Sequence, residues 1–558
     1  MNPSLLSWLD APSPRRGIRF AGLDDSWDFW SYQRLADLTE RFADGLAGAG
    51  VPPDAAVTVI SHGGPRFVAA LFGTMRAGAT PSPLAPPMLF GDPDGYAEHV
   101  HAALTAVRPA AVLVDARLAA TVAPIAASAG APQVIEIESL LAAEATGAAR
   151  DRPLAELALV QFTSGSSGRS RPVRVPHSAL AANVAAIRAW LGMRGEYPTA
   201  SWLPVHHDMG LTGCLITPVV DGSDIWLLSP EQFIQHPLRF LRCFGALGAR
   251  HTAMPTFGLA HIVRRVRPEQ LAGLDFSRWR AVIVGAERVD PVILDRFLNL
   301  LEPYGLRRRA ALPAYGMAEA TLAATGLPVP EEWRALRCEP ASLTVGARIR
   351  VTGAADAQPV VGCGRPLDGV EVRVEDPDGQ PLPEDTVGEI VVRGVSVAAG
   401  YAGPPAASGS LTTFTGDRLR SGDAGFLHGG QLFVLGRLGD SLKIRARTVF
   451  AEDLEAAMAG HGVPSHRFAA VLGVREGTST AVAIVEHPRD GWLAAAAKVL
   501  RHRAPGAEVV VVDAPRGTIL RTTSGKPKRR LLWQLFVAGR LAGNPVSSTG
   551  AGSLRRSE

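Results

Sequence analysis

Two kinds of segment alternate along most of this chain. Short apolar runs, typical of buried strands, occur at Ala111–Val114, Leu157–Phe162 and Ala281–Val284. Longer stretches with apolar residues at helical spacing, such as 32–46 and 178–190, lie between runs of this kind. The alternation predicts an α/β fold in which parallel sheets are covered by helices.

The pattern changes in the last third of the chain. From about position 362 the apolar runs become closely spaced and are separated by Gly and Asp-Gly turns, as at 377–379 and 388–392. This spacing predicts a mainly β subdomain. A helical stretch at 451–458 with further strand-like runs after it predicts a smaller α+β domain at the C-terminal end.

Length and composition narrow the class of protein. A chain of 558 residues exceeds one ordinary core, and 47% hydrophobic with 20% charged residues is the balance of a globular protein. A net charge of +4 does not indicate a nucleic-acid partner. No apolar run is long enough to predict membrane insertion, and the first residues lack a signal-peptide layout, so we expect a cytoplasmic protein. The four scattered cysteines are expected to be reduced thiols.

A Ser/Gly-rich loop follows the apolar run Leu157–Phe162. Glycines allow tight turns, and successive N–H groups with hydroxyls can surround phosphate oxygens. A flexible linker is the alternative for this composition, but a position between a buried strand and a helix disfavours it. The loop lacks the Walker A pattern. The candidate phosphate-binding residues are Thr163, Ser164, Gly165, Ser166, Ser167, Gly168 and Arg171.

This loop resembles the T-S-G-S-T-G-x-P-K-G segment of adenylate-forming enzymes, with Ser170 and Arg171 in place of Pro and Lys. Other motifs of that superfamily follow in the same order. Y-G-x-[TA]-E is matched at 315–319, [ST]-G-D at 421–423, G-R-x-x-D at 436–440 and S-G-K-x-x-R at 524–529. Each motif alone is more often structural than functional, but their shared order is highly specific.

One further segment resembles a single branch of the superfamily. Residues 201–211, Ser-Trp-Leu-Pro-Val-His-His-Asp-Met-Gly-Leu, are similar to the S-W-L-P-x-x-H-D-M-G-L segment of the fatty acyl-AMP ligases. A metal site is the alternative for a His-His-Asp cluster, but no further ligand spacing supports it. The stretch 328–359 matches in place the insertion that marks these ligases and is associated with poor use of coenzyme A.

The resemblance implies roles for the motif residues. Lys526 is the catalytic lysine, Glu319 holds Mg²⁺, and His207 lies beside the acyl carboxylate. Lys526 is also one of only four lysines in the chain. The nucleotide would be bound by the segments that the resemblance assigns to adenine and ribose, namely Gly285, Ala286, Glu287, Tyr315, Gly316, Met317, Ala318, Asp423 and Arg437. In the adenine segment, Val284 stands where the family has Asn.

The same resemblance divides the chain. It implies a large adenylation domain at 1–436, a hinge at 437–440 with Asp440 as its pivot, a small mobile domain at 441–540 that carries Lys526, and a disordered tail at 541–558.

The implied reaction uses ATP and Mg²⁺ to convert a carboxylic acid, most simply a fatty acid, into its acyl-AMP with release of pyrophosphate. The acyl group then passes to the phosphopantetheine thiol of an acyl carrier protein. An acyl-coenzyme A synthetase is the nearest alternative, and a catalytically silent nucleotide-binding relative is another. Amino-acid adenylation is disfavoured, although Asp208 could serve as a partner for an α-amino group. Ala446 stands where an R-G pattern is usual near the pantetheine arm.

Overall fold

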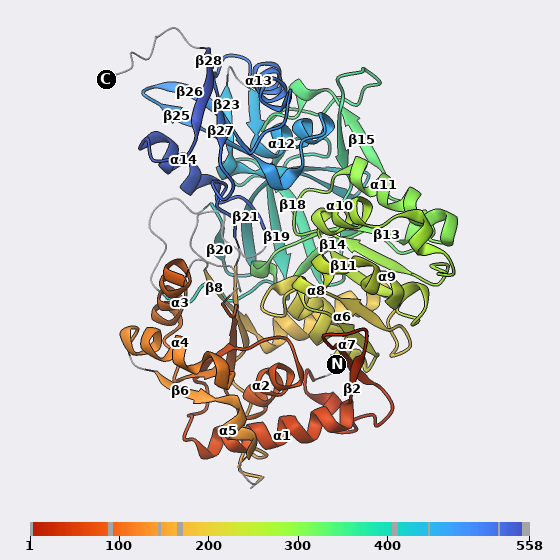
Figure 1. The fold of residues 1–558 in the computed structure, drawn as a ribbon, viewed down its shortest axis with the longest axis vertical. Helices are drawn as coiled ribbons and strands as arrows, with labels where there is room; N and C mark the ends of the chain where they lie inside the picture. Colours follow the sequence, from red (N-terminus) through yellow and green to blue (C-terminus); the bar gives the residue numbers. More distant parts are fainter. Residues whose placement is uncertain are drawn as a thin grey trace.

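The computed structural model describes residues 4–87, 93–130, 132–142, 147–163, 171–403, 411–444, 447–522 and 525–549. It confirms the predicted fold class. Helices cover the mainly parallel sheets of the large domain, a β subdomain follows, and a small α+β domain lies at one end of the molecule. In Figure 1 the small domain (blue) lies at the end opposite the first helices of the chain (red).

The largest sheet places the predicted nucleotide segments at one edge. At its centre β12 (Ala281–Val284) pairs in parallel with β11 (His251–Met254) and β13 (Ala311–Gly316). These strands are largely buried because helices cover both faces of a parallel sheet, and β12 is wholly apolar. The remaining strands are β17 (Arg365–Pro366), β14 (Ala323–Gly326), β9 (Thr199–Ser201), β10 (Ile225–Leu227), β1 (Gly17–Ala21) and β2 (Trp27–Ser31). Ligands of such sheets bind at the carboxyl ends of the strands, where β12 and β13 end.

A second, four-stranded parallel sheet contains the predicted strand β5 (Ala111–Val114). The other strands of this sheet are β4 (Thr80–Leu84), β3 (Ala56–Ile60) and β6 (Gln133–Glu136). The helix predicted at 32–46 is α1 (Tyr32–Gly48), and the Ser31 hydroxyl caps it by accepting a hydrogen bond from the Arg34 N–H. Its apolar face packs into the core shared with α2 (Pro65–Arg76).

The Ser/Gly loop joins two antiparallel strands, so the prediction that it lies between a strand and a helix is wrong. β7 (Leu157–Phe162) pairs with β8 (Pro172–Pro176), and only then does α6 (His177–Leu191) begin. Within β8, Val173 and Val175 are buried and alternate with the partly exposed Arg174, which is the pattern of a short strand.

The β subdomain is an antiparallel sheet, as predicted from its spacing. Its strands are β18 (Val370–Glu375), β19 (Gly388–Gly394), β21 (Arg418–His428), β20 (Thr413–Thr415) and β22 (Gln431–Arg437). β22 leads directly into the predicted hinge, and the small domain then begins with the hairpin of β23 (Ser441–Ile444) and β24 (Arg447–Phe450). The helix predicted at 451–458 is α12 (Ala451–Gly460).

The end of the described chain differs from the predicted disordered tail. Residues of β28 (Asn544–Thr549) pair antiparallel with β27 (Glu508–Ala514) and complete the four-stranded sheet of the small domain. The polar composition misled the prediction because residues 544–546 are exposed and bury little apolar surface. An edge strand can be held by its backbone hydrogen bonds, which composition does not reveal.

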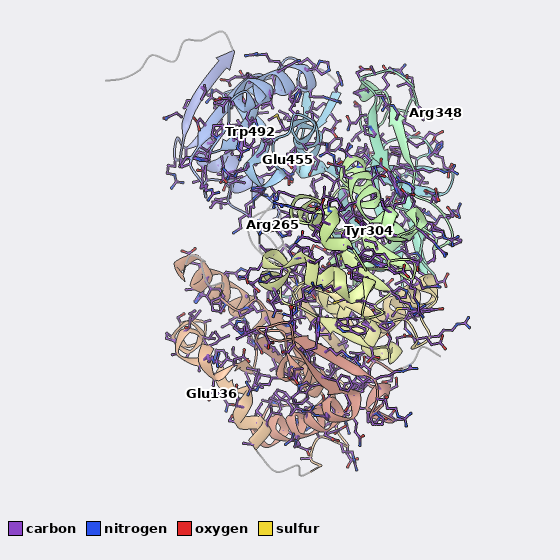
Figure 2. All side chains as sticks on the ribbon, turned by 45° about the vertical axis from the view of Figure 1, so that its right-hand side comes forward. Glu136, Arg265, Tyr304, Arg348, Glu455 and Trp492 are labelled. Carbon is purple, nitrogen blue, oxygen red and sulfur yellow. The ribbon has the colours of Figure 1, made fainter. Side chains whose placement is uncertain are left out.

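The small domain packs against the predicted insertion. In that stretch β15 (Ala335–Cys338) and β16 (Gln358–Val361) form a two-stranded sheet. Side chains from this sheet and from the β subdomain form one buried cluster with Phe450 at the end of β24. In Figure 2 Arg348, from the insertion, lies at the same end of the molecule as Trp492 of the small domain.

Polar contacts reinforce this junction. The Thr448 N–H donates to Thr344 Oγ1 at 3.4 Å, and Arg503 Nη1 donates to Gln358 Oε1 at 3.3 Å. Arg288 of the large domain forms an ion pair with Asp453 of α12.

No helix in the described ranges is long and apolar enough to cross a membrane.

Candidate active site

The predicted nucleotide residues Tyr315, Asp423 and Arg437 form one connected cluster. The Tyr315 hydroxyl donates to Asp423 Oδ2 at 2.7 Å, and Arg437 Nε lies 3.0 Å from Asp423 Oδ1. Arg437 Nη1 also donates to the Ser421 carbonyl at 2.8 Å, which fixes the guanidinium against β21. Burial raises the pKa of the Tyr315 hydroxyl, so this ring stays neutral and presents a flat aromatic face.

Two turns beside this cluster adopt backbone conformations that are rare for their residue types. Ala286, just after β12, has a φ of 66°, and Thr321, just after Glu319, has a φ of 69°. Conformations of this kind cost free energy and persist where the surroundings hold them. The Thr321 hydroxyl donates to the Ser396 carbonyl at 2.6 Å and holds its own turn.

Gly285 and Gly316 are required by packing. A Cβ at Gly316 would lie 1.9 Å from the Leu322 carbonyl oxygen, and one at Gly285 would lie 2.9 Å from the Ala314 carbonyl oxygen. These glycines let the two turns close tightly at the carboxyl ends of β12 and β13.

Glu319 is a buried carboxylate at the carboxyl end of the central sheet. It is 6% exposed, and Oε1 accepts a hydrogen bond from the Tyr401 hydroxyl at 2.6 Å. Burial raises the pKa of Glu319, and the Tyr401 hydrogen bond acts in the opposite direction. A cation bound to this carboxylate would stabilise its ionised form.

The His-His-Asp segment leads directly into a π-helical segment. Asp208 caps the π-helical segment η2 (Met209–Ile216) by accepting a hydrogen bond from the Met209 N–H at 2.8 Å. The rings of His206 and His207 lie 4.6 Å apart. Burial, followed by the neighbouring His207, lowers the pKa of His206 well below its usual value, so His206 is neutral.

A small cavity adjoins this segment. It has a volume of about 20 Å³ and is lined by Thr163, His206 and His207 together with residues of β4 and His99. A cavity of this size can hold one water-sized group. A larger cavity of about 360 Å³, beside Gly369 and Gly394 in the β subdomain, contains none of the predicted site residues.

The loop that carries Lys526 belongs to the small domain and faces two carboxylates of the large domain, those of Asp208 and Glu287. The Thr522 N–H donates to the Lys526 carbonyl at 2.8 Å, and the Lys526 N–H donates to Thr522 Oγ1 at 3.1 Å, which closes a tight turn. Burial raises the pKa of Asp208 and of Glu287, and in each case the charge of Lys526 partly opposes the effect. The Lys526 ammonium therefore lies within electrostatic range of both carboxylates. Phe257 N–H, at the start of α10 (Thr256–Arg265), donates to Glu287 Oε1 at 2.9 Å.

The predicted pivot Asp440 takes part in a buried charge cluster. Arg529, in α14 (Arg529–Val537), lies 2.8 Å from Asp440, 3.0 Å from Glu452 and 2.8 Å from Glu455. Burial, with the negative charge of Asp440, raises the pKa of Glu452 to about 7, and Arg529 opposes this effect.

The structure thus brings together most of the predicted site residues that it describes. The predicted phosphate-loop residues Ser164, Gly165, Ser166, Ser167 and Gly168, together with Ala446, lie outside the described residues. Sequence reasoning missed Tyr401 and two of the three carboxylate partners of Arg529, Glu452 and Glu455. Tyr401 lies in none of the motif segments at 315–319, 421–423, 436–440 and 524–529, and its proximity to Glu319 depends on contacts between distant segments.

The donor set at Glu319 fits a nucleotide-bound Mg²⁺. A hard carboxylate oxygen suits this ion, and Mg²⁺ commonly takes one or two carboxylates plus substrate phosphates. Within the described ranges no group of three or more His, Cys, Asp and Glu side chains could hold a metal ion by itself. Most ligands of an ion at Glu319 would therefore come from the nucleotide and from water.

Comparison with known proteins agrees with this geometry. The family model described as AMP-binding enzyme matches residues 13–402. A long-chain-fatty-acid–AMP ligase, FadD26 of Mycobacterium marinum, is 33% identical over 523 residues, which are 87% of this chain and 88% of that protein. The 4-hydroxyphenylalkanoate adenylyltransferase of the same organism is 31% identical and covers 91% of this chain and 85% of that protein.

Solved structures show the same fold. A fatty acyl-adenylate ligase from a study of the Escherichia coli and Legionella pneumophila enzymes matches with a TM-score of 0.88 and 27% identity, over 96% of this chain and 98% of that one. The L. pneumophila enzyme in complex with acyl adenylate and pyrophosphate matches with a TM-score of 0.71 and 26% identity, over 96% of each chain. The chain belongs to the AMP-binding enzyme family. Its resemblance to the fatty acyl-AMP ligases is confirmed by these relatives.

Proposed function

We propose that this protein activates a fatty acid or a related alkanoic acid as its acyl-AMP and then passes the acyl group to the phosphopantetheine thiol of a carrier protein. The observation that carries the proposal is the hydrogen-bonded cluster of Tyr315, Asp423 and Arg437, three residues that the family motifs assign to the nucleotide. The Lys526 loop of the small domain supports the proposal, because the charge of Lys526 acts on Asp208 and Glu287 of the large domain.

In the first step a substrate carboxylate oxygen attacks the α-phosphorus of ATP. The new C(O)–O–P bond forms as the bond to the leaving pyrophosphate oxygen breaks, so no external acid or oxidant is needed. Two anions must approach each other, so positioning and charge neutralisation dominate catalysis. Mg²⁺ bound at Glu319 would supply further neutralisation of the phosphates.

The chain's own residues have separate tasks in this step. Tyr315 would present its ring to adenine, while Asp423 would accept hydrogen bonds from the ribose hydroxyls and Arg437 would hold Asp423 in place. Lys526 would place its ammonium between the acyl carboxylate and the α-phosphate, and His207 would lie beside the carboxylate. Lysine suits this task because its charge is compact and its stem is flexible.

In the second step a carrier thiol would attack the acyl carbonyl and AMP would leave. The predicted pivot Asp440 would allow the small domain to turn for this step. Ala446, outside the described residues, stands where the family resemblance expects the R-G pattern near the pantetheine arm.

The proposed activity is tested by incubating the protein with ATP, Mg²⁺, coenzyme A, an acyl carrier protein and a panel of fatty and arylalkanoic acids. Mass spectrometry then reads acyl-AMP, acyl-coenzyme A and acyl-carrier protein together. Acyl-AMP with acyl-carrier protein supports the proposal and identifies the acid. Acyl-coenzyme A as the main thioester would make the protein a synthetase, and no product from any acid would contradict the activation step.

Lys526→Ala is expected to lower acyl-AMP formation by at least roughly 100-fold, because it removes the charge that neutralises the reacting anions. The measurement is the initial rate of pyrophosphate release with the preferred acid. Lys528→Ala is the matched control, since it removes the neighbouring lysine and should leave the rate within a few-fold of the wild type. Equal rates for K526A and the wild type would refute the assignment of Lys526.

A further inference from the structure

A segment outside the family motifs given above lies between the end of the Ser/Gly loop and the turn that carries Glu319, and contacts both. It follows β19 and runs from Ser396 to Gly403. The Ala402 N–H donates to the Pro172 carbonyl at 2.8 Å, and Val173 and Tyr401 form an antiparallel bridge. On the other side, the Ala398 N–H donates to the Glu319 carbonyl at 2.9 Å. The backbone of this segment therefore fixes Tyr401 relative to the end of the predicted phosphate loop and to the turn that carries Glu319.

The Tyr401 side chain contacts both the predicted Mg²⁺ ligand Glu319 and the predicted phosphate-binding residue Arg171. Its hydroxyl donates to Glu319 Oε1 at 2.6 Å. The guanidinium carbon of Arg171 lies 3.3 Å from the centre of the Tyr401 ring. Phe414 of β20 meets the ring edge-on, with the centroids 5.1 Å apart. One aromatic side chain thus joins a buried carboxylate to the arginine at the end of the Ser/Gly loop.

This geometry restricts both charged groups. A carboxylate can rotate about its last bond, and a short hydrogen bond to Oε1 fixes its plane and leaves Oε2 for a cation. A guanidinium over an aromatic face is held by the ring quadrupole and by stacking. Hydrogen bonds of this kind commonly orient metal-binding carboxylates, and their loss typically weakens metal binding by roughly 10-fold to 100-fold.

We propose that Tyr401 is a positioning residue that orients the Glu319 carboxylate toward the nucleotide-bound Mg²⁺ and holds Arg171 beside the phosphate site. The inference rests on the proposed function, because it takes Glu319 as a metal ligand. Tyr401 touches no reacting atom in this scheme and acts through the two residues it contacts.

The test compares Tyr401→Phe with the wild type in a binding measurement that needs no turnover. Mn²⁺ replaces Mg²⁺, a non-hydrolysable ATP analogue is added, and electron paramagnetic resonance gives the dissociation constant of the ternary Mn²⁺ complex. Y401F keeps the ring and removes only the donor, so we expect Mn²⁺ binding to weaken roughly 10-fold. The affinity for AMP without metal should stay within a few-fold of the wild type.

Two further variants make the outcome specific. Phe414→Leu removes a ring that packs on Tyr401 without touching its hydroxyl, and its Mn²⁺ affinity should match the wild type. Tyr401→His keeps a ring and a hydrogen-bond donor, and its Mn²⁺ affinity should lie closer to the wild type than that of Y401F. It also serves as the informative variant if Y401F does not fold, in which case binding by Y401H as weak as that of Glu319→Gln would overturn the proposal.

The results separate this inference from the proposed function. If E319Q loses Mn²⁺ binding but Y401F binds as the wild type does, Tyr401 has no positioning role. If E319Q binds Mn²⁺ as tightly as the wild type, the assignment of Glu319 in the proposed function fails first. Equal losses in Y401F and F414L would show that packing, and not the hydroxyl, is responsible, which would also overturn the proposal.

Discussion

Beside the predicted hinge, several charged side chains are buried together around Arg529. Arg529 is the cation that three carboxylates share, and its side chain is only 12% exposed. Glu452 Oε2 is also buried and accepts no hydrogen bond from the part of the chain that the structure describes. A buried carboxylate without full compensation favours its protonated form, which is why the pKa of Glu452 is raised to about 7.

This cluster predicts how stability depends on pH. Between its ordinary pKa and about 7, Glu452 holds its proton in the folded protein and releases it in the unfolded chain. The folded state then binds more protons, so this contribution to the free energy of unfolding falls as the pH rises through that window. Its upper limit is about 3 kcal/mol.

Glu452→Gln should therefore flatten the fall in melting temperature between pH 5 and pH 8, as measured by differential scanning calorimetry. Asp490→Asn, an exposed change in the same domain, is the control and should keep the wild-type slope. An unchanged slope in E452Q would mean that Glu452 does not titrate in this range.

Some residues of the candidate site could be predicted from the sequence, and others could not. The residues Tyr315, Asp423 and Arg437 could be predicted because each lies in a motif of fixed spacing, and the structure brings them within hydrogen-bond distance. Tyr401 could not be predicted in the same way. Its partners Arg171 and Glu319 are far from it in sequence, and their proximity depends on how the segment after β19 packs along β8.

At the scale of elements, local patterns identified strands and helices but not every pairing. The apolar run of β7 indicated a buried strand, yet its antiparallel partner β8 was missed because five residues rich in Pro and Val resemble a loop. The strand β28 was missed for a related reason. Its pairing with β27 uses backbone groups, which every sequence provides.

Deleting residues 544–558 should weaken the small domain, because the deletion exposes the edge of β27. Hydrogen exchange measured by mass spectrometry is expected to rise at 509–513, where β28 now supplies the pairing. Deleting only 550–558 is the matched control and should leave exchange at those residues unchanged. Equal protection of β27 in both truncated proteins would contradict a stabilising role for β28.

At the scale of the whole molecule, the two domains share a core. Phe450 of the small domain is fully buried in a cluster with Cys338, Leu343 and Ile349 from the predicted insertion. The length of the chain predicted more than one core, and the family motifs predicted the division into domains, but the shared core depends on where the insertion folds. That placement is a long-range contact, which periodicity does not encode.

Phe450→Ala should cost roughly 3–5 kcal/mol of stability, because it opens a cavity in this shared cluster. Calorimetry is expected to show the small domain unfolding at a lower temperature than the large domain, while the wild type shows closer transitions. Phe536→Ala, on the outer helix α14, is the comparison and should affect the small domain without separating the transitions. A single unshifted transition in F450A would argue against a shared core.

The two connections between the domains have a mechanical consequence. A rigid body held at one point can rotate in any direction, but a body held at two separated points can rotate only about the line that joins them. The small domain is linked covalently to the large domain at 437–440, and it is held a second time by the packing of Phe450 in the shared cluster. A rotation of the small domain for thioester formation would require this packing contact to separate first. The rate of acyl transfer would then depend on how readily the buried side chains around Phe450 separate, although this cluster lies outside the proposed nucleotide and acyl sites.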